Sequence, residues 1–130
     1  MTYVGMLALM YADVSRDDVR VKSAMDWASN HWTLDENPGM GDQGQFFFYN
    51  IISKCMNALN QETVGTKSGA VIKWREELAK KLISLQRTDP DGTGYWDNRN
   101  NRFWEADPVL VTAYSLLALE LASGETFVKK

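Results

Sequence analysis

The amino-acid sequence predicts an all-α fold built of repeated helical hairpins. Five segments of helical length carry apolar residues at helical spacing, and no segment of useful length alternates apolar and polar residues as a strand would. Segments that are apolar nearly all round alternate with amphipathic ones, with a repeat of roughly 50 residues, which is typical of repeat proteins. The chain has 130 residues, so we expect a single domain, 1–130.

The first two predicted helices differ in character. The segment 2–13 is apolar and has no capping residue before it. The segment 17–31 follows a capping box formed by Ser15 and Asp18, and its apolar residues form one stripe. We therefore expect the first helix to be buried and the second to lie on the outside.

The same alternation continues along the chain. The segment 45–59 is apolar on nearly every side, which is typical of a buried helix. The segment 71–87 has one apolar face and favourable Glu–Lys pairs four residues apart, as an outer helix does. The segment 108–122 has little polar surface and ends before Gly124, a plausible C-terminal stop.

Composition excludes several classes of protein. Hydrophobic residues make up 45% and charged residues 24%, which is typical of a globular chain. The net charge is −3 and no basic stripe is present, so we expect no nucleic-acid partner. A single cysteine fits a reducing compartment, and the apolar N-terminus lacks a basic leader region. We expect a cytoplasmic protein and leave contact with membranes open.

The connection before the last helix contains a recognisable motif. Gln86 ends an amphipathic helix, Gly92, Gly94 and Trp96 follow, and the next helix contains the run 112–119, Thr-Ala-Tyr-Ser-Leu-Leu-Ala-Leu. This pattern resembles the "QW" motif of the prenyltransferase and squalene oxidase repeat, found in terpenoid cyclases related to squalene–hopene cyclase. The resemblance extends over most of the chain.

The resemblance implies a particular architecture. Members of that family form a closed double ring, an α/α toroid, in which inner and outer helices alternate. About five helices cannot close such a ring, so we expect a partial toroid, a fragment or half ring of the family fold. Its apolar inner face would need covering, which predicts a homo-oligomer.

The motif also has a physical interpretation. Gly92 and Gly94 allow a sharp turn between an outer and an inner helix. Gln86, at the end of the outer helix, can hydrogen-bond loop backbone. Trp96 can cover that end of the hairpin. We expect all four residues to be structural.

Two acids precede the last helix. Class II terpenoid cyclases place an Asp-x-Asp-Asp motif at the corresponding point and use its middle acid to protonate an alkene. The resemblance therefore makes Asp107 a candidate proton donor and Glu105 its companion acid, although Pro108 replaces the last acid. The alternative is that Asp107 caps the helix and Pro108 occupies its first position.

The resemblance also implies a polyisoprenoid ligand in a central apolar cavity. Aromatic side chains can line such a cavity and stabilise carbocations, and the alternative is that they pack in the core. Gln43 lies in a Gly-x-Gly-x-x-Gly stretch that has no strand before it, so we expect a loop at the cavity mouth and no dinucleotide site. The predicted substrate-binding residues are Tyr3, Gln43, Phe47, Phe48, Tyr49, Trp104 and Tyr114.

Several functions stay open from the sequence. If the chain is an enzyme, the resemblance implies a class II terpenoid cyclase-like isomerase or lyase. The alternatives are a non-catalytic interaction module and a glycoside-type hydrolase, for which the acid spacing singles out no pair. We expect no cofactor and no metal, because the chain has one histidine, His31, and one cysteine, Cys55.

Overall fold

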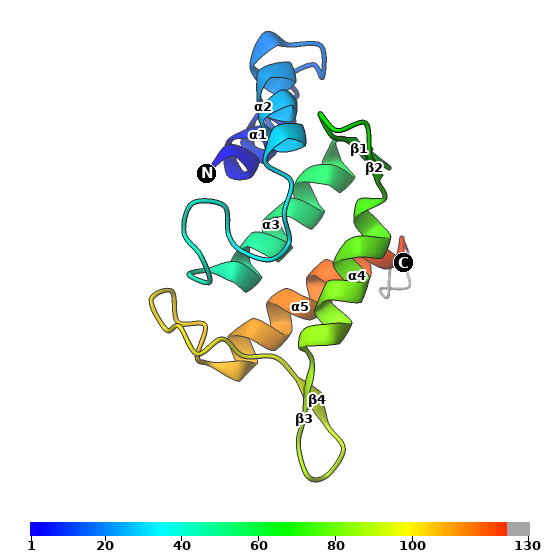
Figure 1. Ribbon diagram of the computed structural model, residues 1–130. Coiled ribbons are helices and arrows are strands. Elements are labelled where there is room, and N and C mark those ends of the chain that lie inside the picture. The colour runs from blue at the N-terminus through cyan, green and yellow to red at the C-terminus, as the bar shows by residue number, and fades with distance from the viewer. Residues whose placement is uncertain (125–130) are drawn as a thin grey trace, which may run out of the picture.

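A computed structural model describes residues 1–124 of the chain. Most of these residues are helical, and the helices lie near the predicted positions (Figure 1). The helices are α1 (Thr2–Tyr11), α2 (Val19–Asn30), α3 (Gln45–Ala58), α4 (Trp74–Leu85) and α5 (Pro108–Ser123). None of them combines the length and apolar character that crossing a bilayer requires.

The prediction of an all-α partial toroid is wrong, because two small antiparallel sheets interrupt the helices. Strand β1 (Val64–Gly65) pairs with β2 (Val71–Ile72), and β3 (Arg87–Thr88) pairs with β4 (Gly94–Tyr95). Each sheet closes a tight turn beside the predicted helix 71–87, whose end residues Val71, Ile72 and Arg87 belong to strands. Strands of two residues are too short to show alternation, so hydrophobic periodicity does not detect them.

The two sheets also correct the predicted limits of the fourth helix. We predicted a helix over 71–87, whereas α4 starts at Trp74 because Val71 and Ile72 belong to β2. Its other end lies at Leu85, and the backbone of Gln86 is already extended as it enters β3. The helix is therefore shorter at both ends.

Helix α3 is the centre of the fold. It packs against α1 on one side and α5 on the other, while α2 packs on α1 and α4 packs on α5 (Figure 1). Along α3 the buried apolar side chains include Tyr49, Ile52 and Met56. Burial of each such side chain contributes about 1.5–3 kcal/mol, so α3 supplies much of the core.

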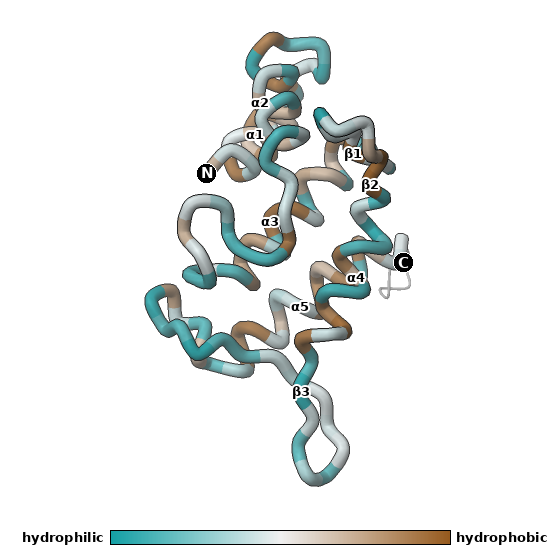
Figure 2. Tube along the Cα trace, viewed as in Figure 1, coloured by the Kyte–Doolittle hydropathy of each residue, from teal (hydrophilic) through white to brown (hydrophobic). Residues whose placement is uncertain are grey.

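Helix α4 shows how an amphipathic sequence fixes an outer position. Trp74, Leu78 and Leu82 are spaced four residues apart and are all buried. The residues between them are largely charged and exposed, so hydrophilic and hydrophobic segments alternate along α4 in Figure 2. The buried stripe packs α4 against α5, and the charged face meets solvent.

The Gln–Gly–Trp motif forms the corner between α4 and α5. The buried indole of Trp96 donates from Nε1 to the backbone oxygen of Leu82 over 2.8 Å, and the backbone N–H of Trp96 donates to Thr112 Oγ1 on α5 over 3.1 Å. A methyl group at Gly94 would lie 2.9 Å from Gln86 Cδ, so the Gln86 side chain lies on Gly94. Gly92 turns the β3–β4 hairpin with φ of +86°.

Candidate functional site

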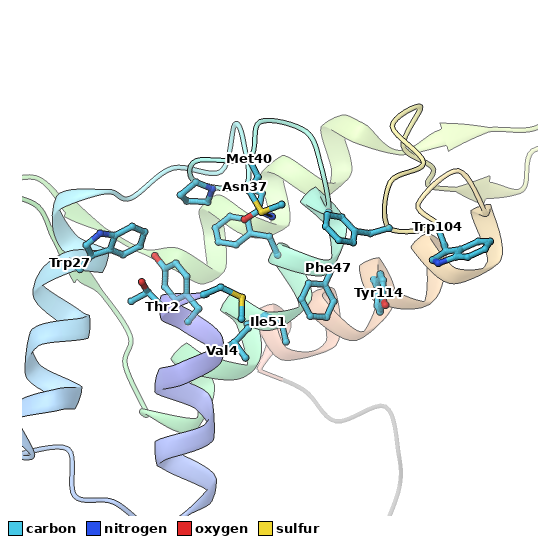
Figure 3. A pocket seen from close by; sticks show the side chains of 15 residues that line it. Thr2, Val4, Trp27, Asn37, Met40, Phe47, Ile51, Trp104 and Tyr114 are labelled. Atoms are coloured by element: carbon cyan, nitrogen blue, oxygen red, sulfur yellow. Dashed lines mark hydrogen bonds between the residues drawn. The ribbon is translucent and has the colours of Figure 1, made fainter.

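An apolar pocket of about 360 Å³ lies where α1, α3 and α5 meet two loops (Figure 3). One loop precedes α3 and the other precedes α5. The pocket is lined by Met1, Thr2, Tyr3, Val4, Trp27, Asn37, Pro38, Met40, Gly44, Phe47, Phe48, Ile51, Phe103, Trp104 and Tyr114. These residues come from four helices and two loops, so the site depends on the tertiary fold.

The pocket is elongated. In Figure 3 the labelled side chains run from Trp27 at one end to Trp104 at the other, with Phe47 and Ile51 of α3 between them. Val4 on α1 lies along the same row. The shape suits an extended molecule better than a compact one.

Contacts between aromatic rings hold the pocket walls in place. Tyr3 packs edge-on against Trp27, with ring centroids 6.3 Å apart, and contacts Phe48 at 5.6 Å. Farther along, Phe47 packs edge-on against Tyr114 at 5.9 Å. Such arrangements are favourable for aromatic pairs, so much of the wall is formed before any ligand arrives.

No charged side chain lines the pocket in the part of the chain that the structure describes. None of its described lining residues is Asp, Glu, Lys, Arg or His. Burial raises the pKa of the Tyr3 phenol well above its usual value, with a smaller contribution from Cys55, so this hydroxyl stays neutral. The site therefore favours neutral, apolar molecules and offers no ordinary acid or base to a bound ligand.

The structure brings together five of the predicted substrate-binding residues and leaves two outside the pocket. Those that line it are Tyr3, Phe47, Phe48, Trp104 and Tyr114. Tyr49 lies in the core, where its hydroxyl donates to the backbone oxygen of Leu34 over 2.6 Å. Gln43 stays in the loop before α3, and its backbone oxygen accepts a hydrogen bond from Asn37.

The two predicted catalytic acids lie outside the pocket lining and contact helix starts. Glu105 is completely buried, and its Oε1 accepts from the backbone N–H of Phe47 over 2.7 Å. Asp107 is exposed and accepts from the backbone N–H of Val109 over 2.9 Å, with Pro108 following it at the start of α5. These contacts are those of capping residues, and the catalytic roles stay a prediction.

Several lining residues have no obvious signal in the sequence. Trp27 lies on the amphipathic helix α2 and stacks on His31, with ring centroids 4.4 Å apart, yet it also lines the pocket. Asn37 and Met40 reach the pocket because the loop before α3 folds over it, with positive φ at Gly39, Gly41 and Gly44. Only the tertiary fold reveals their position.

Residues suited to metal binding are dispersed. Among residues 1–124 no three His, Cys, Asp or Glu side chains gather as a metal site. His31 forms a hydrogen bond between Nδ1 and the backbone oxygen of Trp27. Cys55 is buried in α3, and burial raises the pKa of its thiol to about 12.

No family model, curated protein or solved structure matches this chain.

Proposed function

We propose that this protein binds an apolar, chain-like ligand of the polyisoprenoid class in the pocket between α1, α3 and α5. The main observation behind the proposal is the elongated, aromatic lining of that pocket, whose described side chains carry no charge. The resemblance of the Gln86–Trp96 motif to prenyltransferase and squalene oxidase repeats points to the same ligand class. Within this proposal the protein acts in the cytoplasm.

The dimensions and chemistry of the pocket favour a neutral ligand. Its volume of about 360 Å³ falls at the lower end of the range for small-molecule sites, about 300–1,000 Å³. Burying apolar surface contributes about 25 cal/mol per Å², so a branched hydrocarbon chain gains affinity from every methyl group that it buries. Because none of the described lining residues has a cationic side chain, an isoprenoid alcohol or hydrocarbon fits better than a diphosphate.

The positions of the acids favour binding without turnover. Glu105 is buried, and both of its carboxylate oxygens already accept hydrogen bonds, from Phe47 and Asn98. Asp107 faces solvent at the start of α5. We therefore rank cyclisation of the ligand below binding without turnover. It predicts that incubation with squalene or prenyl diphosphates yields a new product by mass spectrometry and that Asp107→Asn abolishes it.

Tryptophan fluorescence measures binding directly, since Trp27 and Trp104 line the pocket. Titration with geranylgeraniol in detergent below its micellar concentration should change the emission and saturate. Phe47→Ala should weaken binding about tenfold or more, because it removes a large apolar wall. Leu117→Ala is the matched control, because Leu117 is 44% exposed against 41% for Phe47 and lies outside the lining.

Two results would contradict the binding proposal. One is the absence of saturable binding by the unmodified protein. The other is equal weakening by Phe47→Ala and Leu117→Ala, which would place the ligand outside the pocket.

Self-association is a second candidate function, favoured by the outer face of α5. Val109, Leu116 and Leu117 are 77%, 55% and 44% exposed, and the run 108–119 contains no charged residue. A face of this kind is typical of a protein interface, and a second copy of the chain is the partner that we propose for it.

Light scattering tests the oligomer. We expect a mass above that of the monomer, reduced to the monomer by Leu116→Glu and unchanged by Ile83→Glu. Ile83 is the control because it is 65% exposed on α4, away from the α5 face. If the unmodified protein is a monomer, the proposal of self-association is wrong.

A further inference from the structure

A completely buried carboxylate lies behind the pocket wall. Glu105 has no exposed surface, and its Oε1 and Oε2 accept from the backbone N–H of Phe47 over 2.7 Å and from Asn98 Nδ2 over 2.8 Å. No described ion pair involves Glu105. Burying a carboxylate is costly, so these hydrogen bonds and the positive end of the α3 dipole have to stabilise it.

The contacts of Glu105 join the three segments that form one end of the pocket. Phe47 belongs to the first turn of α3. Asn98 Nδ2 also donates to the backbone oxygen of Asp42 over 2.6 Å, which fixes the loop before α3. The backbone N–H of Asn98 donates to the backbone oxygen of Glu105 over 2.8 Å, which closes the loop before α5.

The residues next to Glu105 are themselves pocket residues. Phe103 packs on Gly44, where a methyl group would lie 3.1 Å from Phe103 Cδ2. Trp104 has φ of +64°, which is unusual for a bulky side chain, and its indole is held at the pocket while 76% exposed. A strained residue persists only where its surroundings fix it, and Glu105 is the adjacent fixed point.

We propose that Glu105 is the positioning residue of the pocket, a buried anchor that holds Phe47, Phe103 and Trp104 in ligand-binding positions without touching the ligand. Its effect on a ligand rests on the binding function proposed above. Its effect on the loop before α5 does not, because the hydrogen bonds are present without a ligand. Glutamine has nearly the same size but offers one acceptor oxygen, so Glu105→Gln leaves either Phe47 or Asn98 without its partner.

Limited proteolysis tests the anchoring step without any ligand. Arg99 and Arg102 are exposed trypsin sites in the loop before α5, and cleavage there needs local opening of the backbone. We expect Glu105→Gln to be cut at these two sites about tenfold faster than the unmodified protein. Lys67, in the β1–β2 turn, is the internal control and should be cut at an unchanged rate.

A stability control separates anchoring from general destabilisation. Asp18→Ala removes the N-terminal cap of α2, where Asp18 Oδ1 accepts from the backbone N–H of Arg20, and it lies away from the pocket lining. This variant should leave cleavage at Arg99 and Arg102 unchanged. Equal rates in Glu105→Gln and the unmodified protein, or equal acceleration by Asp18→Ala, would overturn the proposal.

Ligand affinity gives the second readout. Geranylgeraniol should bind Glu105→Gln about tenfold more weakly, while Asp18→Ala should bind it as the unmodified protein does. If the unmodified protein fails to bind this alcohol, the binding function fails, and faster loop cleavage in Glu105→Gln still supports the anchor. If the unmodified protein binds and Glu105→Gln binds equally well, the positioning role is wrong and the binding function stands.

Discussion

The substitution Trp96→Phe tests the corner between α4 and α5. The indole of Trp96 is 3% exposed and donates to the backbone oxygen of Leu82 over 2.8 Å. In a regular helix that oxygen would accept from Gln86, but the backbone N–H of Gln86 bonds to Ile83. Trp96 therefore satisfies a carbonyl that the end of α4 leaves free.

The expected destabilisation follows from this geometry. Losing the hydrogen bond and leaving a buried carbonyl without a partner costs about 1–3 kcal/mol, and the smaller ring adds a cavity term of about 1 kcal/mol. We expect a total near 3 kcal/mol. With an unfolding entropy of about 2.1 cal/mol/K per residue, this lowers the Tm by about 10 °C.

Urea unfolding followed by circular dichroism measures the change. Trp104→Phe is the matched control, since Trp104 is 76% exposed and its substitution should change stability by about 0.5 kcal/mol or less. An equal effect of the two substitutions would refute the structural role of Trp96.

Three further predictions concern capping and ionisation. Asp107→Ala should lower stability by about 1 kcal/mol in urea unfolding, because it removes the cap that accepts from Val109. Hydrogen bonds from Arg20 lower the pKa of Asp18 from 3.8 to about 2. The ionised Asp18 carboxylate therefore stabilises the folded protein fully above about pH 4, and this contribution is lost as the pH falls towards 2. The difference in Tm between the unmodified protein and Asp18→Asn should therefore be smaller at pH 2 than at neutral pH. Burial raises the pKa of Cys55 to about 12, so iodoacetamide at pH 8 should modify it only after unfolding.

The helices could be predicted because the residues that specify each of them lie close together in the sequence. The stripe formed by Trp74, Leu78 and Leu82 is visible at a spacing of four residues, and each of these residues is buried in the structure. The start of α5 was equally visible, since Asp107 followed by Pro108 is a favourable helix start and forms one here. Patterns within one or two helical turns were sufficient for these elements.

The strands were missed because a tight turn, and not a hydrophobic pattern, brings their residues together. In the β3–β4 hairpin, the backbone N–H of Asp89 donates to the oxygen of Thr93, and that of Gly92 donates back to Asp89. The Asp-Pro-Asp-Gly sequence is typical of a turn, but two paired residues on each side leave no alternation to detect.

The candidate site could be predicted only in part. Aromatic residues on apolar helices, such as Phe47 and Tyr114, were natural candidates, because apolar helices that flank one another can enclose a cavity. The contact between Glu105 and Phe47 could not be predicted, because it spans 58 positions in the chain. No local pattern encodes such a contact.

Two-dimensional NMR of the backbone amides is the most direct test of whether the pocket between α1, α3 and α5 binds the ligand. On titration with geranylgeraniol, we expect shifts for the amides of Tyr3, Phe47 and Tyr114 and for the indole N–H of Trp27, which line the pocket. The amides of the charged face of α4, such as Glu77, should stay unchanged. Shifts confined to the α4 face, or none at saturating ligand, would show that the pocket does not bind this ligand.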